Sequence, residues 1–301
     1  MKYSKIYFIG ILMILLTSNA VKAQDKDLLD LVDTDKPKKE VVKNAFKSIR
    51  VINGHSMEFL SPGTMDFRIL HRFGQFNIPN TFAGFDQASM RIGLDFGVTR
   101  YLQFGFGRST FKKEFDGYIK LAPIRQSTGH HAFPATIALV GGMTLNSLPY
   151  ADPTIHNYFS SRLAYYGQVI IGRKFSEGIT LQVTPTIVHN NIVPLASQPN
   201  DVYAVGFGGR LKMNKRTAFT WDYFYVLNGI QKDANNLPLN FNPLSVGVDI
   251  ETGGHVFQLH VSNSAGMNER AFITETTGDW KKFDIRFGFN LSRIFQISHK
   301  K

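Results

Sequence analysis

Apolar and polar residues alternate strictly in the last patterned stretch of the chain, KFDIRFGFNLSRIF, at residues 282–295. The apolar positions are Phe283, Ile285, Phe287, Phe289 and Leu291, and the polar ones are Asp284, Arg286, Gly288, Asn290 and Ser292. Neighbouring side chains of a β-strand point to opposite faces. This period of two therefore predicts a strand with one apolar and one polar face.

The same alternation recurs along most of the chain after residue 56. It predicts further strands at residues 65–73, 91–98, 102–107, 118–121, 135–144, 162–171, 179–187, 203–211, 219–225, 244–251 and 257–262. The segment 135–144 is apolar on both faces and fits the pattern least well. The whole set amounts to about twelve strands of roughly ten residues, a length that crosses a bilayer when the strand is tilted.

The connections between these strands alternate in length. Tight turns are expected at residues 99–100, 176–178, 214–215 and 253–254, and long polar loops at 74–89, 145–160, 190–201, 228–242 and 264–281. Short periplasmic turns and longer external loops are typical of outer-membrane barrels. Two connections fit less well, because 108–114 is short for the external side and 125–133 is long for the periplasmic side.

A soluble β-sandwich or a lipocalin-type barrel would also alternate, with its apolar face turned inward. A soluble sheet of this size would usually have shorter strands and more surface Lys and Glu than this chain. In hydrocarbon, a closed ring of strands pairs every backbone polar group. We therefore expect an all-β fold, a closed antiparallel transmembrane β-barrel of about 12 strands whose last strand pairs with its first.

The N-terminus has the pattern of a secretory signal peptide. Lys2 and Lys5 precede a short apolar run at residues 6–16, and Val21 and Ala23 form a small-residue cleavage site. An uncleaved anchor helix is the alternative. We expect a signal peptide at residues 1–23, a solvated periplasmic N-terminal segment at 24–56 and the barrel at 57–301. The protein would then be exported to the outer membrane through a cleaved signal peptide.

Charge and cysteine content narrow the partners. The net charge of +11 falls to +8 without residues 1–23, which contain Lys2, Lys5 and Lys22 and no acidic residue. An exported chain rarely meets nucleic acid, so the basic balance favours anionic lipid or polysaccharide. Outer-membrane lipid is the expected partner, with an envelope protein or a small solute as further candidates. With no cysteine, the chain has neither a disulfide framework nor a haem-attachment motif.

Several motifs together resemble a family of predicted outer-membrane β-barrels that is classed as a domain of unknown function. They include HRFG (71–74), MRIGLDFGVT (90–99), FGRSTFKKEFDGYIK (106–120), ADPTIHNYFSSRL (151–163), RKFSEGITLQVTPTIVHNNIVP (173–194), NDVYAVGFGGRLK (200–212) and VGVDIETGGHVFQLHVSNSAGMNERAFI (246–273). The resemblance covers nearly the whole mature chain, and the last motif is its most specific. It implies a barrel and its location, and it implies no activity and no catalytic residue.

The predicted polar face contains many charges of both signs. The basic residues are Arg68, Arg72, Arg91, Lys120, Arg162, Arg210, Lys212 and Arg286, and the acidic ones are Asp66, Asp95, Asp116, Asp222, Asp249, Glu251 and Asp284, with His260 on the same face. Unpaired charge in a narrow lumen is costly, so we expect cross-strand ion pairs. Asp284 and Arg286 are expected near Asp66 and Arg68. This leaves an occluded ion-paired lumen, a narrow mixed-charge pore, or a selective anion channel.

We expect no enzyme, so the barrel would serve as a structural or partner protein or as a narrow solute passage. The alternative is a lipid-acting hydrolase that uses His260 and Ser262, with Asn263 and Ser264 nearby. His260 and Ser262 lie on one strand, whereas a triad usually draws its base and nucleophile from different strands.

Other candidate sites have simpler explanations. His130 and His131 are adjacent but have no carboxylate beside them, so we expect no metal and no cofactor. The glycine runs FGFGRS and VGFGGR open no helix and are not phosphate loops. In the long loops, Asp152, His156, Glu269 and Arg270 could contact a ligand or partner, although a solvated loop is the default.

Overall fold

The computed structural model describes residues 38–79, 82–150, 152–154, 156–193 and 198–298. The chain divides into two units, Met1–Lys38 and Lys39–Lys301, and the second contains the barrel. The expected signal peptide and the first part of the expected periplasmic segment lie outside the described residues. Among the described residues, no helix is long and apolar enough to cross a membrane.

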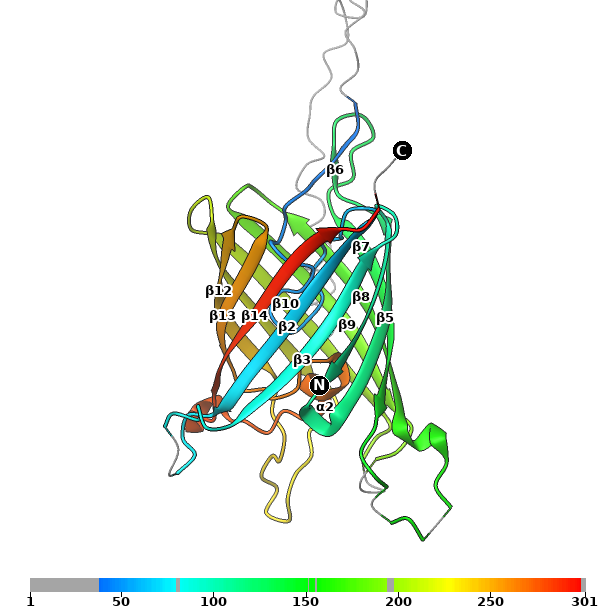
Figure 1. The fold of residues 1–301 in the computed structure, drawn as a ribbon, viewed down its shortest axis with the longest axis vertical. Helices are drawn as coiled ribbons and strands as arrows, with labels where there is room; N and C mark the ends of the chain where they lie inside the picture. Colours follow the sequence, from blue (N-terminus) through cyan, green and yellow to red (C-terminus); the bar gives the residue numbers. More distant parts are fainter. Residues whose placement is uncertain (1–37, 80–81, 151, 155, 194–197, 299–301) are drawn as a thin grey trace, which may run out of the picture. The chain divides into compact units, whose positions relative to one another are not determined.

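Within the described residues, twelve strands form a closed barrel in which every neighbouring pair is antiparallel (Figure 1). This confirms the predicted fold class. The barrel strands are β2 (Thr64–Gln75), β3 (Ala88–Gly97), β4 (Leu102–Ser109), β5 (Glu114–Ile124), β7 (Thr136–Asn146), β8 (Leu163–Lys174), β9 (Ile179–Asn190), β10 (Asp201–Lys212), β11 (Thr217–Val226), β12 (Leu244–Thr252), β13 (His255–Ser262) and β14 (Arg286–Gln296).

The last strand, β14, closes the ring against the first, β2, as expected. The expected register is wrong, however. Arg286 pairs with Gln75, and Arg68 stands opposite Ser292. Because the two strands are antiparallel, the start of β14 meets the end of β2. Arg286 therefore lies at the opposite end of β2 from Asp66 and Arg68.

The segment just before β14 is not a strand, although its residues alternate. A 3-10 turn, η3 (Trp280–Lys282), ends at Phe283, whose φ of 62° is left-handed. The backbone N–H of Asp284 donates to the carbonyl of Asp279 at 3.0 Å, which folds the segment into a loop. As a result Phe283 is exposed and Ile285 is buried, so these two residues do not share a lipid-facing surface.

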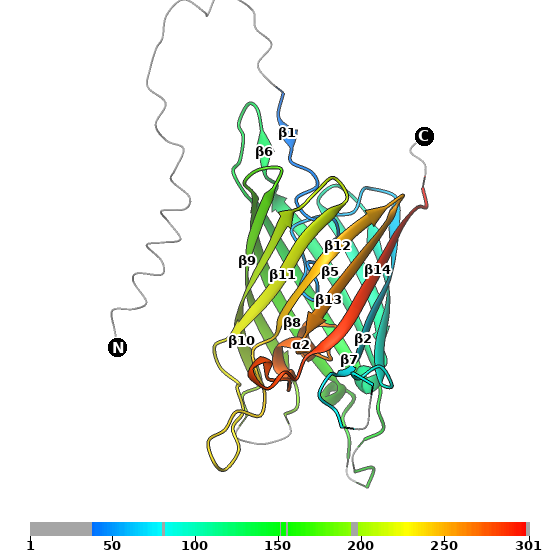
Figure 2. The same cartoon turned by 90° about the vertical axis from the view of Figure 1, so that its left-hand side faces the viewer.

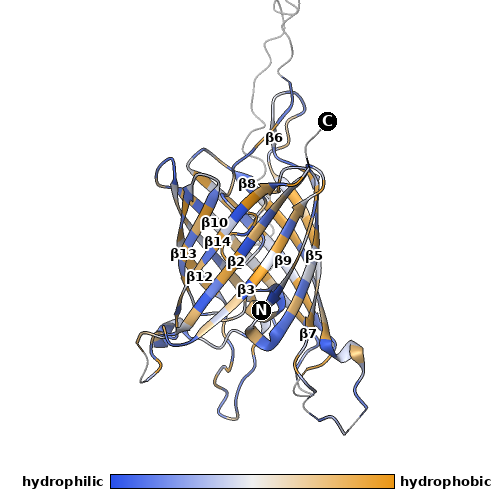
Figure 3. Cartoon of the chain, in the orientation of Figure 1, coloured by the Kyte–Doolittle hydropathy of each residue, from blue (hydrophilic) through white to orange (hydrophobic). Residues whose placement is uncertain are grey.

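Along the strands, the apolar side chains face outward and the polar ones face inward. Phe104, Phe106 and Ile119 are 40%, 51% and 61% exposed, whereas Arg68 and Lys120 are fully buried. Figure 3 shows apolar and polar bands alternating along the strands. An apolar outer wall is what contact with acyl chains requires, and every strand has two neighbours, so no edge is left open.

Tight turns and long loops lie at opposite ends of the barrel (Figures 1 and 2). Residues 98–101, 175–178, 213–216 and 253–254 connect strands at one end, called here the tight-turn end. The long connections lie at the other end, called here the long-loop end. The longest of these contains the short helix α2 (Glu269–Thr274), and another contains the 3-10 turn η2 (Phe159–Arg162).

Both connections that fit the pattern poorly have a structural reason. The long 125–135 connection contains β6 (Ser127–Thr128), which pairs with β1 (Glu40–Val41) in a two-stranded sheet at the tight-turn end. It is long because it pairs with the N-terminal segment as that segment enters the barrel. The short connection between β4 and β5 is a 3-10 turn, η1 (Phe111–Lys113).

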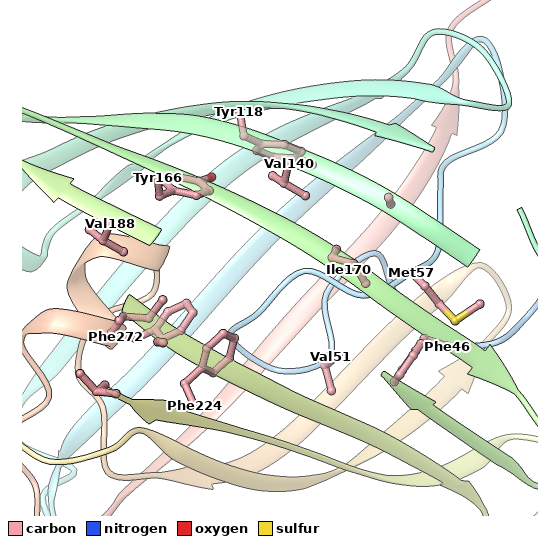
Figure 4. Packing of buried hydrophobic residues seen from close by; sticks show 14 of the residues in the cluster. Phe46, Val51, Met57, Tyr118, Val140, Tyr166, Ile170, Val188, Phe224 and Phe272 are labelled. Carbon is pink, nitrogen blue, oxygen red and sulfur yellow. The ribbon is translucent and has the colours of Figure 1, made fainter. Parts of the chain in front are cut away.

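Residues 42–63, called here the lumen insert, enter the barrel from the tight-turn end, and most of residues 45–60 are buried inside it. A tight hairpin forms its centre. The backbone N–H of Val51 donates to the carbonyl of Gly54 at 2.9 Å, and the backbones of Arg50 and His55 form an antiparallel β-bridge. The expected solvated segment is therefore wrong for residues 45–56, most of which are buried. Figure 4 shows Phe46, Val51 and Met57 of the insert facing Ile170 and Phe224 of the wall, with Phe272 of α2 beside Phe224.

Candidate functional site

The hairpin of the lumen insert is held by a carboxylate of the wall. Asp222 Oδ2 on β11 accepts hydrogen bonds from the backbone N–H groups of Asn53 at 2.7 Å, Gly54 at 3.0 Å and Ile52 at 3.3 Å. Three converging N–H groups form an anion-binding concavity, and bonds to an ionised acceptor are stronger than neutral ones. Asp222, which the sequence placed in the lumen, thus fixes the turn at the centre of the barrel.

The carbonyl groups of the same hairpin are bound by residues of β13 and β14, two and three strands along the wall from β11. Gln258 Nε2 donates to Val51 C=O at 2.6 Å, and Asn290 Nδ2 donates to Ile52 C=O at 3.1 Å. Arg72 adds a side-chain contact, since its Nη2 donates to Asn53 Oδ1 at 2.8 Å. The wall therefore supplies the partners that water would supply to an open turn.

The returning arm of the insert is bound in the same way. Lys120 Nζ donates to the carbonyls of Ser56 at 2.7 Å and Glu58 at 2.6 Å. Gln182 donates to His55 C=O at 2.7 Å and accepts from Met57 N–H at 2.9 Å. Lys120 and Gln182 come from β5 and β9, so the insert is attached to the wall on several sides.

A second insertion reaches the lumen from the long-loop end. Arg50 Nη1 of the lumen insert lies 2.8 Å from Glu269 Oε1 of α2, and His55 Nε2 lies 3.3 Å from the same oxygen. The side chains of Arg50 and Glu269 are 1% and 0% exposed. Asn268 caps α2, because its side chain accepts from Ala271 N–H at 2.9 Å. The two insertions therefore meet inside the barrel, one from each end.

The wall itself contains ion pairs, both within a strand and between strands. Arg91 on β3 binds Asp116 on β5 through two hydrogen bonds of 2.8 and 2.5 Å. Arg68 lies 2.5 Å from Asp66 and 3.6 Å from Asp95. Five of the lumen charges that the sequence predicted, Arg68, Arg91, Asp66, Asp95 and Asp116, therefore form ion pairs with one another.

Two further wall charges bind polar groups rather than opposite charges. Asp249 accepts from Thr220 Oγ1 and from Gln258 Nε2, each at 3.0 Å. Arg210 Nη1 donates to the carbonyl of Ala45 at 3.3 Å. Both side chains face the lumen, and Arg210 contacts the insert directly.

Other predicted lumen residues lie at the rims. Arg162 belongs to η2, with its guanidinium 3.7 Å from the centre of the Tyr150 ring. Asp284 forms a loop contact with Asn77, and Glu251 forms an ion pair with Lys47. Two more predicted residues complete this group, Arg286 at the long-loop end and exposed Lys212 at the tight-turn end. These residues lie at strand ends or in the connections, so they belong to the rims of the barrel rather than to the middle of the lumen.

His260 and Ser262 both face the lumen but do not form a catalytic pair. The Ser262 hydroxyl accepts from Ser245 Oγ at 2.9 Å, and it is completely buried. His260 Nδ1 lies 3.3 Å from Gln258 C=O, and among the described residues its Nε2 has no hydrogen-bond partner. No serine is bound to His260 within the described chain, so this geometry does not support the hydrolase hypothesis.

The long-loop end contains a charge cluster that the alternation of apolar and polar residues could not predict. Arg270 of α2 binds both Glu114 and Glu275, and Lys112 of η1 lies 2.7 Å from Glu275. Burial alone would raise the pKa of Glu275, but the charges of Arg270 and Lys112 lower it below its usual value. This cluster attaches the loop of α2 to the β4–β5 connection.

The structure offers no metal centre within the residues it describes: no group of three or more His, Asp or Glu side chains is arranged to hold an ion. His130 and His131 contact each other edge to face at 4.0 Å in the β5–β7 connection.

Comparisons with known proteins agree with the architecture. The family model described as a membrane bound beta barrel domain (DUF5777) matches residues 46–295. No curated protein matches the chain. Among solved structures, the NanC porin is 8% identical over 78% of this chain and 100% of its own, with a TM-score of 0.47. Salmonella typhi OmpF in complex with daunomycin is 6% identical over 77% and 97%, with a TM-score of 0.39. Likenesses this distant say nothing about what a chain binds.

Proposed function

Since the chain belongs to the DUF5777 family of membrane-bound β-barrels, we propose that it is a non-enzymatic outer-membrane passage for small polar solutes, held closed by its own lumen insert. The observation that carries this proposal is the nature of the contacts between the insert and the wall. Asp222, Lys120, Gln182, Gln258 and Asn290 bind its backbone through hydrogen bonds that water can replace.

The energies of such contacts favour a removable closure. A neutral hydrogen bond exchanged for bonds to water contributes only about 0.5–1.5 kcal/mol net, and one to a charged group such as Asp222 or Lys120 about 1.5–3 kcal/mol. The apolar side chains of the insert, such as Phe46 and Met57, add a stabilising share through burial. The insert enters from the tight-turn end, where β1 and β6 pair. A force on the N-terminal segment could therefore withdraw it without breaking the barrel.

The wall that withdrawal would expose is polar and charged with both signs. Arg68 and Arg91 stand beside Asp66, Asp95 and Asp116 on one side. The inward positions of β8 and β9 contain Gln168, Gln182 and several threonines instead. A lumen of this kind has no single sign in excess, so it suits small polar solutes better than a selective anion channel.

The experiment compares conductance in planar bilayers. The mature chain is expected to be closed, whereas a variant lacking residues 42–60 is expected to show discrete conductance. A second variant, Asn53→Cys with Ser245→Cys and called here the lock variant, can form a disulfide between the insert and the wall. The two native side chains lie in hydrogen-bond contact at 2.8 Å. The chain has no other cysteine, so the oxidised lock forms without competing pairs.

Two outcomes decide the proposal. Any conductance of the mature chain should vanish in the oxidised lock and return on reduction. A deletion variant that inserts and folds but stays silent would contradict the passage and favour a permanently closed scaffold.

A further inference from the structure

The two ends of the barrel differ in charge. Ten basic residues lie in the connections or at the strand ends of the tight-turn end, and three acidic ones accompany them. The basic residues are Lys39, Lys43, Arg100, Arg125, Arg173, Lys174, Lys212, Lys215, Arg216 and Arg293, and the acidic ones are Glu40, Glu177 and Glu251. Two of the acidic residues are already paired, since Glu177 lies 2.7 Å from Lys174 and Glu251 forms an ion pair with Lys47.

The long-loop end carries no such excess. Outside the lumen, nine basic residues among its described ones are accompanied by eight acidic ones. The basic residues are Arg108, Lys112, Lys113, Arg162, Lys232, Arg270, Lys281, Lys282 and Arg286, and the acidic ones are Asp86, Glu114, Asp152, Asp201, Asp233, Glu275, Asp279 and Asp284. The basic excess outside the lumen therefore belongs to one rim.

Two of the rim arginines point outward, on the lipid-facing side of the wall. Arg173 on β8 stands opposite Leu181 on β9 in the strand register, and residues in register share a face of the wall. Because Leu181 faces outward, Arg173 does too. Its guanidinium lies 5.1 Å from the centre of the exposed Phe175 ring. Arg293 pairs with His255, the first residue of β13, and its guanidinium lies 5.0 Å from the centre of the exposed Phe295 ring.

A third pair repeats this arrangement in the β3–β4 turn. The guanidinium of Arg100 lies 6.0 Å from the centre of the Tyr101 ring, and Tyr101 is exposed. In the strand order of the barrel, β14 and β8 stand on opposite sides, and the β3–β4 turn lies between them. The three pairs are thus spread around the wall rather than gathered at one point.

We propose that the tight-turn rim binds anionic phospholipid headgroups, with Arg100, Arg173 and Arg293 as the phosphate contacts. Aromatic rings on the outer wall of a barrel mark the boundary between acyl chains and headgroups. A guanidinium beside such a ring lies at headgroup depth, where it can bind phosphate oxygens with two parallel hydrogen bonds.

The placement of these arginines favours a lipid over a soluble anionic polymer. A polymer or protein would approach the rim along the barrel axis and meet Lys215 and Arg216 in the β10–β11 turn. Arg173 and Arg293 instead face sideways, beside the rings that contact acyl chains. Anionic lipid attracts basic residues near the surface, and the attraction weakens within a Debye length.

The test uses the mature chain in vesicles of phosphatidylcholine that contain spin-labelled phosphatidylglycerol or spin-labelled phosphatidylcholine. The wild type is expected to prefer phosphatidylglycerol, and added salt is expected to reduce the preference. The triple variant R100Q/R173Q/R293Q is expected to lower the relative association constant by at least about fivefold.

The matched control, K232Q/K281Q/K282Q, removes three positive charges from the long-loop end. It is expected to change the relative association constant by less than about twofold. Equal association of both lipids with the wild type overturns the proposal. So does an equal loss in both triple variants, because the effect would then follow net charge alone. Neither outcome depends on whether the lumen opens, so this inference and the proposed passage can fail separately.

Discussion

The Arg50 guanidinium and the Glu269 carboxylate meet at 2.8 Å inside the barrel, although 219 positions separate them in the chain. Arg50 belongs to the lumen insert, and Glu269 belongs to α2 in the last long connection. Arg50 Nη1 also donates to Asn53 C=O at 2.6 Å, so the same group stabilises the hairpin. The ion pair therefore joins the two segments that enter the barrel from opposite ends.

Removing one partner of this pair should be far more costly than replacing both. Arg50→Ala or Glu269→Ala leaves a buried charge without its partner, at a cost of about 3–5 kcal/mol. Arg50→Met with Glu269→Met removes both charges and should cost much less. Urea unfolding in lipid vesicles gives the three free energies of unfolding. Additive single and double effects would contradict a direct interaction.

The contact of Asp222 with the hairpin predicts a local effect. Asp222→Asn removes the charge and replaces one acceptor oxygen by an amide that cannot accept from the backbone N–H groups. A hydrogen bond to a charged group contributes about 1.5–3 kcal/mol, so the hairpin should open more often. Hydrogen exchange at the amides of Asn53 and Gly54 should become faster.

The control for this prediction is Asp233→Asn. Asp233 accepts from the backbone N–H groups of Asn235 and Leu237 in a long loop, so it makes similar bonds far from the insert. Exchange at Asn53 should not change in the control. Faster exchange of the hairpin in both variants would contradict the assigned role of Asp222.

The alternation of side chains is sufficient to predict the barrel, because the sequence of each strand alone shows which residues lie on its apolar face and which on its polar face. Arg68, Arg91 and Lys120 were placed in the lumen for that reason, and they face it. The lumen insert was missed because its partners lie far away in sequence and its charges resemble those of a solvated segment. One local signal could have found it: Asn53–Gly54 is a favoured hairpin turn, and it follows Val51 and Ile52.

Register was harder to predict than strand identity. Alternation fixes which face a residue occupies, but it does not fix which residue stands opposite. Asp284 and Arg286 were therefore expected beside Asp66 and Arg68, at the wrong end of the seam. The charge cluster of Glu114, Arg270 and Glu275 escaped prediction for a related reason, since a loop has no periodicity to read.

Acid should loosen the connection that contains α2. The pKa of Glu275 is lower in the folded protein than in the unfolded chain, so its contribution to stability is present above about pH 4.3. It is lost as the pH falls through the folded pKa. Limited proteolysis of residues 263–285 should therefore increase at low pH. In Glu275→Gln, cleavage should already be increased at neutral pH and should depend less on pH. Identical acid profiles for both proteins would contradict this role.

A hydrolase using His260 and Ser262 can be tested directly. Ser262 is bound to Ser245 and is closed off from lipid by the wall, so the wild type should cleave phospholipid vesicles no faster than Ser262→Ala. Released fatty acid measures the rate. A wild-type activity that disappears in Ser262→Ala would contradict the non-enzymatic proposal.

Two adjacent glycines on β7 give opposite predictions from one small change. A Cβ at Gly142 would overlap the ring of Tyr166, which fills the lumen side of the wall, whereas a Cβ at Gly141 would meet nothing within 4 Å on the outer side. Gly142→Ala should therefore cost about 1–3 kcal/mol, as overpacking does. Gly141→Ala should be neutral or stabilise by up to about 1 kcal/mol, because it restricts the unfolded chain. Urea unfolding of the two variants compares them at matched positions. If Gly142→Ala is as stable as Gly141→Ala, then Tyr166 does not occupy the lumen as the structure places it.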